Sequence, residues 1–131
     1  LLQPVKGVAQ TRVDQTLIKG PALINFWATW CPSCYEEHAD LMRLTQQGVT
    51  IYGVNYRDDR AEAIQFLSRL GNPFKANFFD EKADIGFEFG VTGAPETFFV
   101  DSQGLVQYRH VGVISSKNWN ESLRAVYEGM K

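Results

Sequence analysis

Hydrophobic positions along this chain follow two different spacings. Residues 22–28 are almost continuously apolar, and such a run predicts a strand that is buried on both faces of a sheet. Residues 32–47 carry apolar side chains at helical spacing, with Gly48 as a stop, and this predicts an amphipathic helix. The same criteria predict further strands over 49–55, 76–79, 96–101 and 105–111, and further helices over 59–70, 82–89 and 116–129.

Turn and capping residues mark several ends of these elements. Asp59, with Glu62 three residues later, resembles a capping box, and Ser116 is expected to cap the last helix. Residues 102–104, Ser-Gln-Gly, predict a hairpin turn between the last two strands. Residues 1–20 are weakly patterned, and we expect a loose leader there, with short strand pieces.

The order of the predicted elements is β-α-β-α-β-α-β-β-α. Strands joined through a helix pair in parallel with right-handed crossovers, whereas a hairpin is antiparallel. We therefore expect an α/β fold with a central mixed β-sheet flanked by helices. A chain of 131 residues fits one domain, so the expected domain spans residues 1–131.

Composition and charge exclude several classes of function. The net charge is -2 with acids and bases interspersed, so no basic block favours binding of nucleic acid or anionic lipid. No apolar stretch approaches the roughly 18 residues that a membrane span requires. The chain begins at Leu1 without an initiator Met, and we expect a fragment or mature form that has lost a signal or anchor.

The two cysteines, Cys31 and Cys34, lie where the first predicted strand meets the first predicted helix. A helix N-terminus favours a thiolate, because unpaired N–H groups and the helix dipole stabilise negative charge there. The thiolate is the nucleophile of disulfide exchange, and a second cysteine one turn along can resolve the mixed disulfide. The pattern predicts a dithiol–disulfide oxidoreductase, with Cys31 as the more exposed attacking thiolate and Cys34 as the more buried resolving thiol.

Other uses of a cysteine pair fit less well. The flanking Trp27 and Trp30 disfavour an inert surface disulfide. Structural zinc requires four ligands, and only His38 and His110 could add to the two cysteines. Tyr35 follows the pair, so this is not a haem-attachment motif. The sequence has no Gly-rich phosphate loop of the common patterns. We therefore expect no metal and no cofactor beyond the redox-active pair.

Four segments in the same order resemble the DsbE (CcmG) group of thioredoxin-fold proteins. They are Cys-Pro-Ser-Cys-Tyr-Glu-Glu-His over 31–38, Gly-Val-Asn-Tyr-Arg-Asp-Asp over 53–59, Gly-Ala-Pro-Glu-Thr-Phe over 93–98 and Tyr-Arg-His over 108–110. The similarity runs from about residue 21 to residue 119. It implies a thioredoxin fold with an inserted strand-helix segment around residues 58–90.

The resemblance also implies a substrate-binding loop. Pro95 is expected to be cis, Gly93 to allow close approach, and the backbone of Ala94 to pair with an extended substrate as an added strand. Trp30, beside Cys31, is expected to be an exposed apolar contact for substrate. Trp27 and His38 are interpreted as packed residues. Core or groove-lining positions are also expected for Phe78, Phe79, Phe87, Phe89, Phe98 and Phe99.

Acidic residues near the thiols are the remaining candidates. Thioredoxin has a buried Asp six residues before the first cysteine, but this chain has Asn25 there, which cannot act as a base. Glu37 matches an active-site acid of the DsbE group, and a carboxylate there would raise the pKa of Cys34 and could shuttle its proton. The alternative is an ordinary solvated helix charge. Glu96 could face the thiols or a cationic substrate, or equally be a solvated charge at a strand start.

The resemblance implies a periplasmic reductant of the cysteine pair of oxidised apocytochrome c, reduced in turn by a membrane protein of the DsbD type. It would be a monomer, tethered to the inner membrane by an N-terminal segment absent from this chain. The nearest alternative is a general or nitrite-reductase-linked thiol reductase of the same fold. An oxidase would reverse the direction of transfer. A copper-handling module would need a longer cysteine spacing and a distal His, and a peroxidase would need Thr-X-X-Cys.

Overall fold

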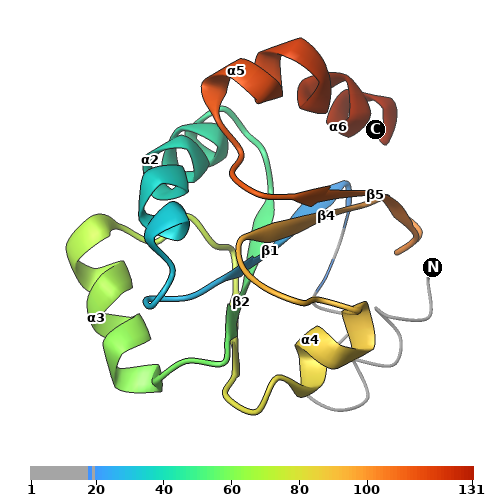
Figure 1. Ribbon diagram of the computed structural model, residues 1–131. Coiled ribbons are helices and arrows are strands. Elements are labelled where there is room, and N and C mark those ends of the chain that lie inside the picture. Colours follow the sequence, from blue (N-terminus) through green and yellow to red (C-terminus); the bar gives the residue numbers. More distant parts are fainter. Residues whose placement is uncertain (1–17, 19) are drawn as a thin grey trace.

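The computed structural model describes residue 18 and residues 20–131. The loose leader expected over residues 1–20 therefore lies almost wholly outside the described residues. The remainder forms a layered α/β structure in which helices cover both faces of a sheet (Figure 1).

The sheet has five strands in the described part of the chain, in the order β3-β2-β1-β4-β5 (Figure 1). Strands β1, β2 and β3 run parallel to one another, whereas β4 is antiparallel to β1 and to β5. The predicted mixed sheet with a terminal antiparallel hairpin is thus confirmed. The strand bounds are β1 (Ala22–Trp27), β2 (Ile51–Tyr56), β3 (Asn77–Asp80), β4 (Glu96–Val100) and β5 (Val106–Val111).

Strand β1 is buried on both faces, as its continuous apolar run predicts. Leu23 and Trp27 join one core cluster, whereas Ile24 and Phe26 join the cluster on the opposite face. Alternate side chains of a strand point to opposite faces, so each cluster receives every second residue. The two cysteines follow shortly after the C-terminal end of this central strand.

The helices divide between the two clusters. Helices α2 (Pro32–Gln46) and α3 (Arg60–Leu70) pack on one face together with the C-terminal helix, and α4 (Asp84–Phe89) packs on the other (Figure 1). The α3 cap is confirmed, since the Asp59 side chain accepts a hydrogen bond from the Glu62 backbone N–H. Helix α4 begins two residues later than predicted, because Ala83 has a left-handed φ of 63°.

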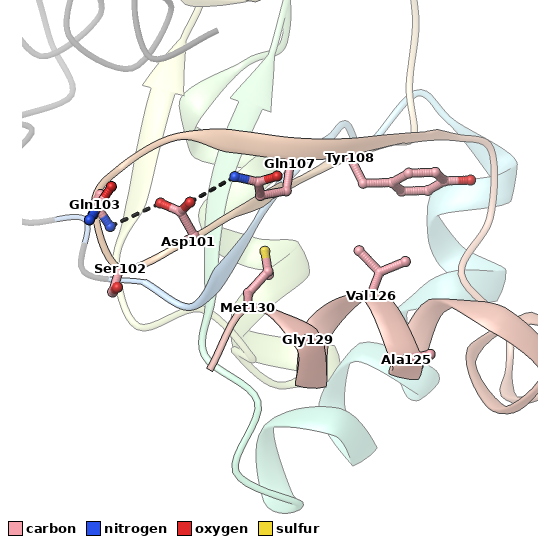
Figure 2. Close-up of a pocket in the computed structure, with 9 residues that line it drawn as sticks. All are labelled: Asp101, Ser102, Gln103, Gln107, Tyr108, Ala125, Val126, Gly129 and Met130. Carbon is pink, nitrogen blue, oxygen red and sulfur yellow. Dashed lines mark hydrogen bonds between the residues drawn. The ribbon is translucent and has the colours of Figure 1, made fainter.

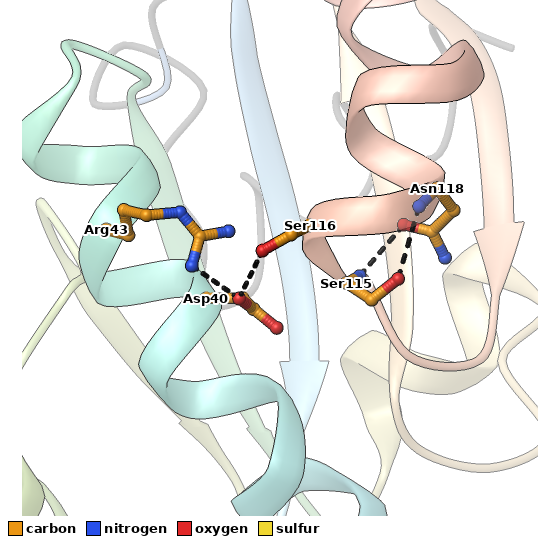
Figure 3. A network of polar contacts seen from close by, with 5 residues as sticks. All are labelled: Asp40, Arg43, Ser115, Ser116 and Asn118. Atoms are coloured by element: carbon orange, nitrogen blue, oxygen red, sulfur yellow. Dashed lines mark hydrogen bonds and ion pairs between the residues drawn. The ribbon is translucent and has the colours of Figure 1, made fainter.

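The C-terminal helix corrects two expectations. It consists of α5 (Ser116–Asn118), a π-helical turn η2 (Trp119–Leu123) and α6 (Arg124–Gly129) rather than one continuous α-helix. Its cap is Ser115, not Ser116, because the Ser115 and Asn118 side chains each accept the other's backbone N–H (Figure 3). A reciprocal pair needs the residue at the third helical position to reach back, and only the Ser115 register allows that.

Phe87 is the exception among the predicted core phenylalanines. It is 84% exposed, whereas Phe89, Phe98 and Phe99 are buried. Phe87 lies on the outer side of the short helix α4, whose inner side carries Ile85 and Phe89 into the core. It still lines a surface cavity, so the groove-lining half of the prediction holds.

Candidate functional site

The two thiols lie at the start of α2, where the structure places Cys31 as the N-cap and Pro32 in the first turn. Both cysteines are free, and the Cys34 backbone N–H donates to Cys31 Sγ over 3.2 Å. An N–H group at a helix start that points at sulfur can stabilise negative charge that develops on that sulfur during thiol exchange. The structure therefore places Cys31 at the helix start, as the sequence pattern predicted.

The cis-proline loop meets the thiols from a distant part of the chain. The Ala94–Pro95 peptide bond is cis, as expected, and Cys31 Sγ donates to the Ala94 carbonyl oxygen over 3.3 Å. A Cβ atom added at Gly93 would meet nothing within 4 Å, so the outer side of the loop is open. A cavity of about 250 Å³ beside Ser33 is lined by residues 92–96 and 111–113.

The expected difference in exposure between the cysteines is wrong. Cys31 and Cys34 are each 3% exposed. The loop that contains Ala94 covers Cys31, and Cys34 is one of the buried residues of α2. Burial, hydrogen bonding with Cys31 and the charge of Glu37 raise the pKa of the Cys34 thiol well above its ordinary range. This raised pKa favours the protonated thiol form of Cys34.

Glu37 is fully buried, so the alternative of a solvated helix charge is wrong. Its Oε1 accepts from Asn25 Nδ2 over 3.0 Å, and its Oε2 accepts from the Ile114 backbone N–H over 2.8 Å. Burial raises the pKa of Glu37 to about 7, although both hydrogen bonds oppose the shift; the nearby charge of Asp40 adds to it. A carboxyl group with that pKa takes up and releases a proton near neutral pH.

Asn25 occupies the position at which thioredoxin carries its acid. Its Nδ2 also donates to Thr97 Oγ1 over 3.0 Å, which ties β1 and β4 to the Glu37 carboxylate. Its Oδ1 is buried and has no hydrogen-bond partner among the described residues.

Helix α2 is held against the segment before α5 by two of its acids. Glu37 binds the Ile114 N–H, and one turn later Asp40 Oδ1 accepts from Ser116 Oγ over 3.2 Å and from Arg43 over 2.5 Å (Figure 3). The contacts to Ile114 and Ser116 join α2 to α5 and to the segment that precedes it.

Glu96 is 1% exposed, so a solvated charge at the strand start is wrong here too. Its Oε1 accepts from Arg109 Nε over 2.9 Å and from a second Arg109 nitrogen over 2.5 Å, while its Oε2 accepts from the Thr92 N–H. The cation that binds Glu96 therefore belongs to this chain and not to a substrate. The sequence did not reveal Arg109 as the partner of Glu96, because this pairing depends on the β4–β5 register. In that register Glu96 lies opposite Val111, and Arg109 is two residues before Val111 on β5.

Trp30 and Trp27 separate as the sequence predicts. Trp30 is 51% exposed and Trp27 is buried. The Trp30 indole N–H donates to the Arg57 carbonyl oxygen over 2.9 Å, and Arg57 itself has a left-handed φ of 49°. The exposed ring beside Cys31 is therefore held in place by the loop that follows β2.

Asp58 is a residue of the site that sequence reasoning missed. Its carboxylate accepts from the Thr29 N–H over 2.6 Å, from Thr29 Oγ1 over 2.8 Å, from Asn55 Nδ2 over 3.1 Å and from the Asp59 N–H over 2.8 Å. It clamps the loop that leads into Cys31. The available signal was its place, directly after a buried strand that neighbours the strand before the cysteines.

Other features of the surface lie apart from this site. A cavity of about 570 Å³ lies between the β4–β5 turn and α6, and none of the predicted site residues lines it (Figure 2). Within residue 18 and residues 20–131, no group of three or more His, Cys, Asp or Glu is arranged to hold a metal ion. Over the same residues, no helix has the length and apolarity to cross a bilayer.

Comparisons with known proteins agree with this geometry. The Redoxin family matches residues 6–126. The Pseudomonas fluorescens biotype C thiol:disulfide interchange protein DsbE is 46% identical over 97% of this chain and 74% of the relative. The chain belongs to the DsbE family of redoxins. DsbE of Vibrio cholerae serotype O1 is 52% identical over 89% of this chain, which spans 64% of that relative's length.

Solved structures give the same result for the DsbE fold. The chain is similar to MTB dsbF, with a TM-score of 0.69 and 27% identity over 86% of this chain and 84% of that one. It is also similar to a thio-disulfide isomerase from Thermus thermophilus, with a TM-score of 0.67 and 26% identity over 84% and 81% of the two chains. The predicted thioredoxin-like fold is therefore confirmed.

Proposed function

We propose that this DsbE-family chain is a thiol:disulfide oxidoreductase that reduces a disulfide in an extended polypeptide. The observation that supports it most directly is the contact between Cys31 Sγ and the Ala94 carbonyl oxygen, 3.3 Å apart. It sets the nucleophile beside the backbone of a cis-proline loop, where an extended partner can pair as an added strand.

The reaction has two steps. The Cys31 thiolate attacks one sulfur of the partner disulfide, which forms a mixed disulfide and releases the other partner sulfur as a thiolate. Cys34 then loses its proton and attacks Cys31 Sγ, which breaks the mixed disulfide. Two electrons have moved to the partner, which leaves as a dithiol, and Cys31–Cys34 is left as a disulfide. Glu37 is the proton acceptor for Cys34, and Trp30 contacts the partner.

The family relationship supports a specific setting for this chemistry. The partner is the cysteine pair of oxidised apocytochrome c during cytochrome c maturation, and a DsbD-type membrane protein restores the Cys31–Cys34 thiols. The site is periplasmic, and residues 1–131 act as one thioredoxin-like domain. The chemistry needs no metal or nucleotide, because the cysteine pair itself carries the electrons.

Trapping tests the proposal. A Cys34→Ser variant cannot resolve the intermediate and should accumulate a mixed disulfide between Cys31 and apocytochrome c, whereas Cys31→Ser should trap nothing. A potential between roughly -270 and -200 mV supports a reductant, and one near about -120 mV assigns the opposite direction of transfer. Failure to trap any polypeptide carrying a Cys-X-X-Cys-His segment from periplasm would count against the substrate.

A further inference from the structure

A second surface cavity adjoins the thiol site and has no part in the chemistry described so far. It measures about 360 Å³ and lies between the loop after β2 and helix α4. Its lining residues are Tyr56, Arg57, Lys82, Ala83, Asp84, Phe87 and Val91.

The cavity lies next to the active site, because Trp30 contacts two of the residues that line it. The Trp30 ring lies 6.4 Å from the Tyr56 ring, centre to centre, and its indole N–H donates to the Arg57 carbonyl oxygen. Val91, on the opposite wall, is only three residues before Ala94 in the same loop. A polypeptide that pairs with Ala94 therefore passes close to the cavity.

The lining combines positive charge with an aromatic surface. Arg57 and Lys82 are exposed, and neither has an ion-pair partner among the described residues. Asp84, the acid in the lining, already takes part in a contact. Phe87 is 84% exposed, more than any other large hydrophobic residue that the structure describes. The lining therefore carries two cations and one acid, which is a net positive charge in a chain whose net charge is -2.

We propose that this cavity, the Arg57–Lys82 subsite, binds an acidic side chain of the partner polypeptide together with an adjacent apolar one. The cations attract the carboxylate, and Phe87 and Tyr56 give the apolar neighbour a surface to cover. The proposal rests on the proposed function, because the occupant is a segment of the same polypeptide whose disulfide reacts at Cys31.

The length of the loop between Val91 and Ala94 determines how far the acidic residue of the partner lies from the reacting cysteine. Three residues of fully extended chain span about 10 Å, so Val91 lies no farther than that from Ala94. The favoured partner therefore carries Asp or Glu about three to four residues from the reacting cysteine. An acid placed much farther along the chain gains nothing from this subsite.

Matched peptides test the subsite. Two peptides with the same internal disulfide differ only in having Glu or Gln about three residues from the cysteine, and the reduced protein is mixed with each under single-turnover conditions. We expect the Glu peptide to react about threefold faster or more at low salt, with the difference shrinking as salt rises. The double variant Arg57→Gln/Lys82→Gln should remove the difference, because it removes both positive charges of the subsite. The Arg57 carbonyl group that binds Trp30 is kept in this variant.

The control is Lys117→Gln, which removes one exposed positive charge on α5 and should leave the preference unchanged. Equal rates for the two peptides, or a full preference retained by the double variant, would overturn the subsite while leaving the proposed function intact. Reduction of neither peptide, with no mixed disulfide to apocytochrome c trapped by Cys34→Ser, would overturn the proposed function itself.

Discussion

Asn25 Nδ2 on β1 donates to Glu37 Oε1 on α2 over 3.0 Å, and the charge of Glu37 acts on the Cys34 thiol. Thioredoxin places its buried acid on the strand, at the position of Asn25, whereas in this chain the helix supplies the acid and the strand supplies an amide that orients it. A carboxylate that accepts two hydrogen bonds, yet has a pKa raised to about 7 by burial, can change its charge near neutral pH. The pair therefore couples the charge beside Cys34 to pH.

Glu37 should make the folding stability depend on pH. Its pKa is higher in the folded protein, about 7, than its ordinary value of 4.5. The folded state therefore holds a proton that the unfolded state has lost, and stability present below pH 4.5 is lost as the pH rises through 7. We expect Glu37→Gln to remove a decline of roughly 3 kcal/mol, measured by urea unfolding between pH 5 and pH 8.

The comparison needs two controls. Glu36→Gln changes the neighbouring, exposed acid and should keep the decline. His38, whose pKa is lowered by burial, is present in every variant, so the difference between profiles isolates Glu37. Parallel profiles for the wild type and Glu37→Gln would show that Glu37 keeps its ordinary pKa.

Removing the Asp58 carboxylate should loosen the loop before Cys31. Asp58→Ala leaves the Thr29 N–H and the Asn55 amide without their acceptor, and we expect a loss of about 2 kcal/mol of unfolding free energy. The rate of Cys31 alkylation should change as well, because the loop sets its position. Asp59→Asn is the matched control, since Asn caps a helix nearly as well as Asp. If both variants unfold at the same urea concentration, Asp58 is not a clamp.

Glu96 and Arg109 should be energetically coupled. Arg109→Met leaves a buried carboxylate without its cation, and Glu96→Gln removes the charge that the guanidinium binds. A double-mutant cycle should give a coupling of about 1–3 kcal/mol, because one partner is buried. The exposed pair Glu128–Lys131 is the control and should couple by less than about 0.5 kcal/mol. Equal coupling in the two cycles would contradict a buried, desolvated Glu96.

The sequence by itself determined the order of strands and helices along the chain and the position of the thiols at a helix start, whereas the cis-proline loop was implied by the family resemblance. These depend on local patterns, such as the apolar run of β1 and Pro32 after Cys31, which survive in any arrangement of the chain. The resemblance then identified Glu37 as an active-site acid, although it left open whether that acid is buried.

Only the tertiary structure decided the environment of each polar group. Glu37 is buried because α2 packs against Ile114, and Glu96 meets Arg109 because of the β4–β5 register. Cys31 is covered because a loop 63 residues away folds over it. Burial, and the pKa that follows from it, is a property of contacts between distant segments, so a linear pattern carries little information about it.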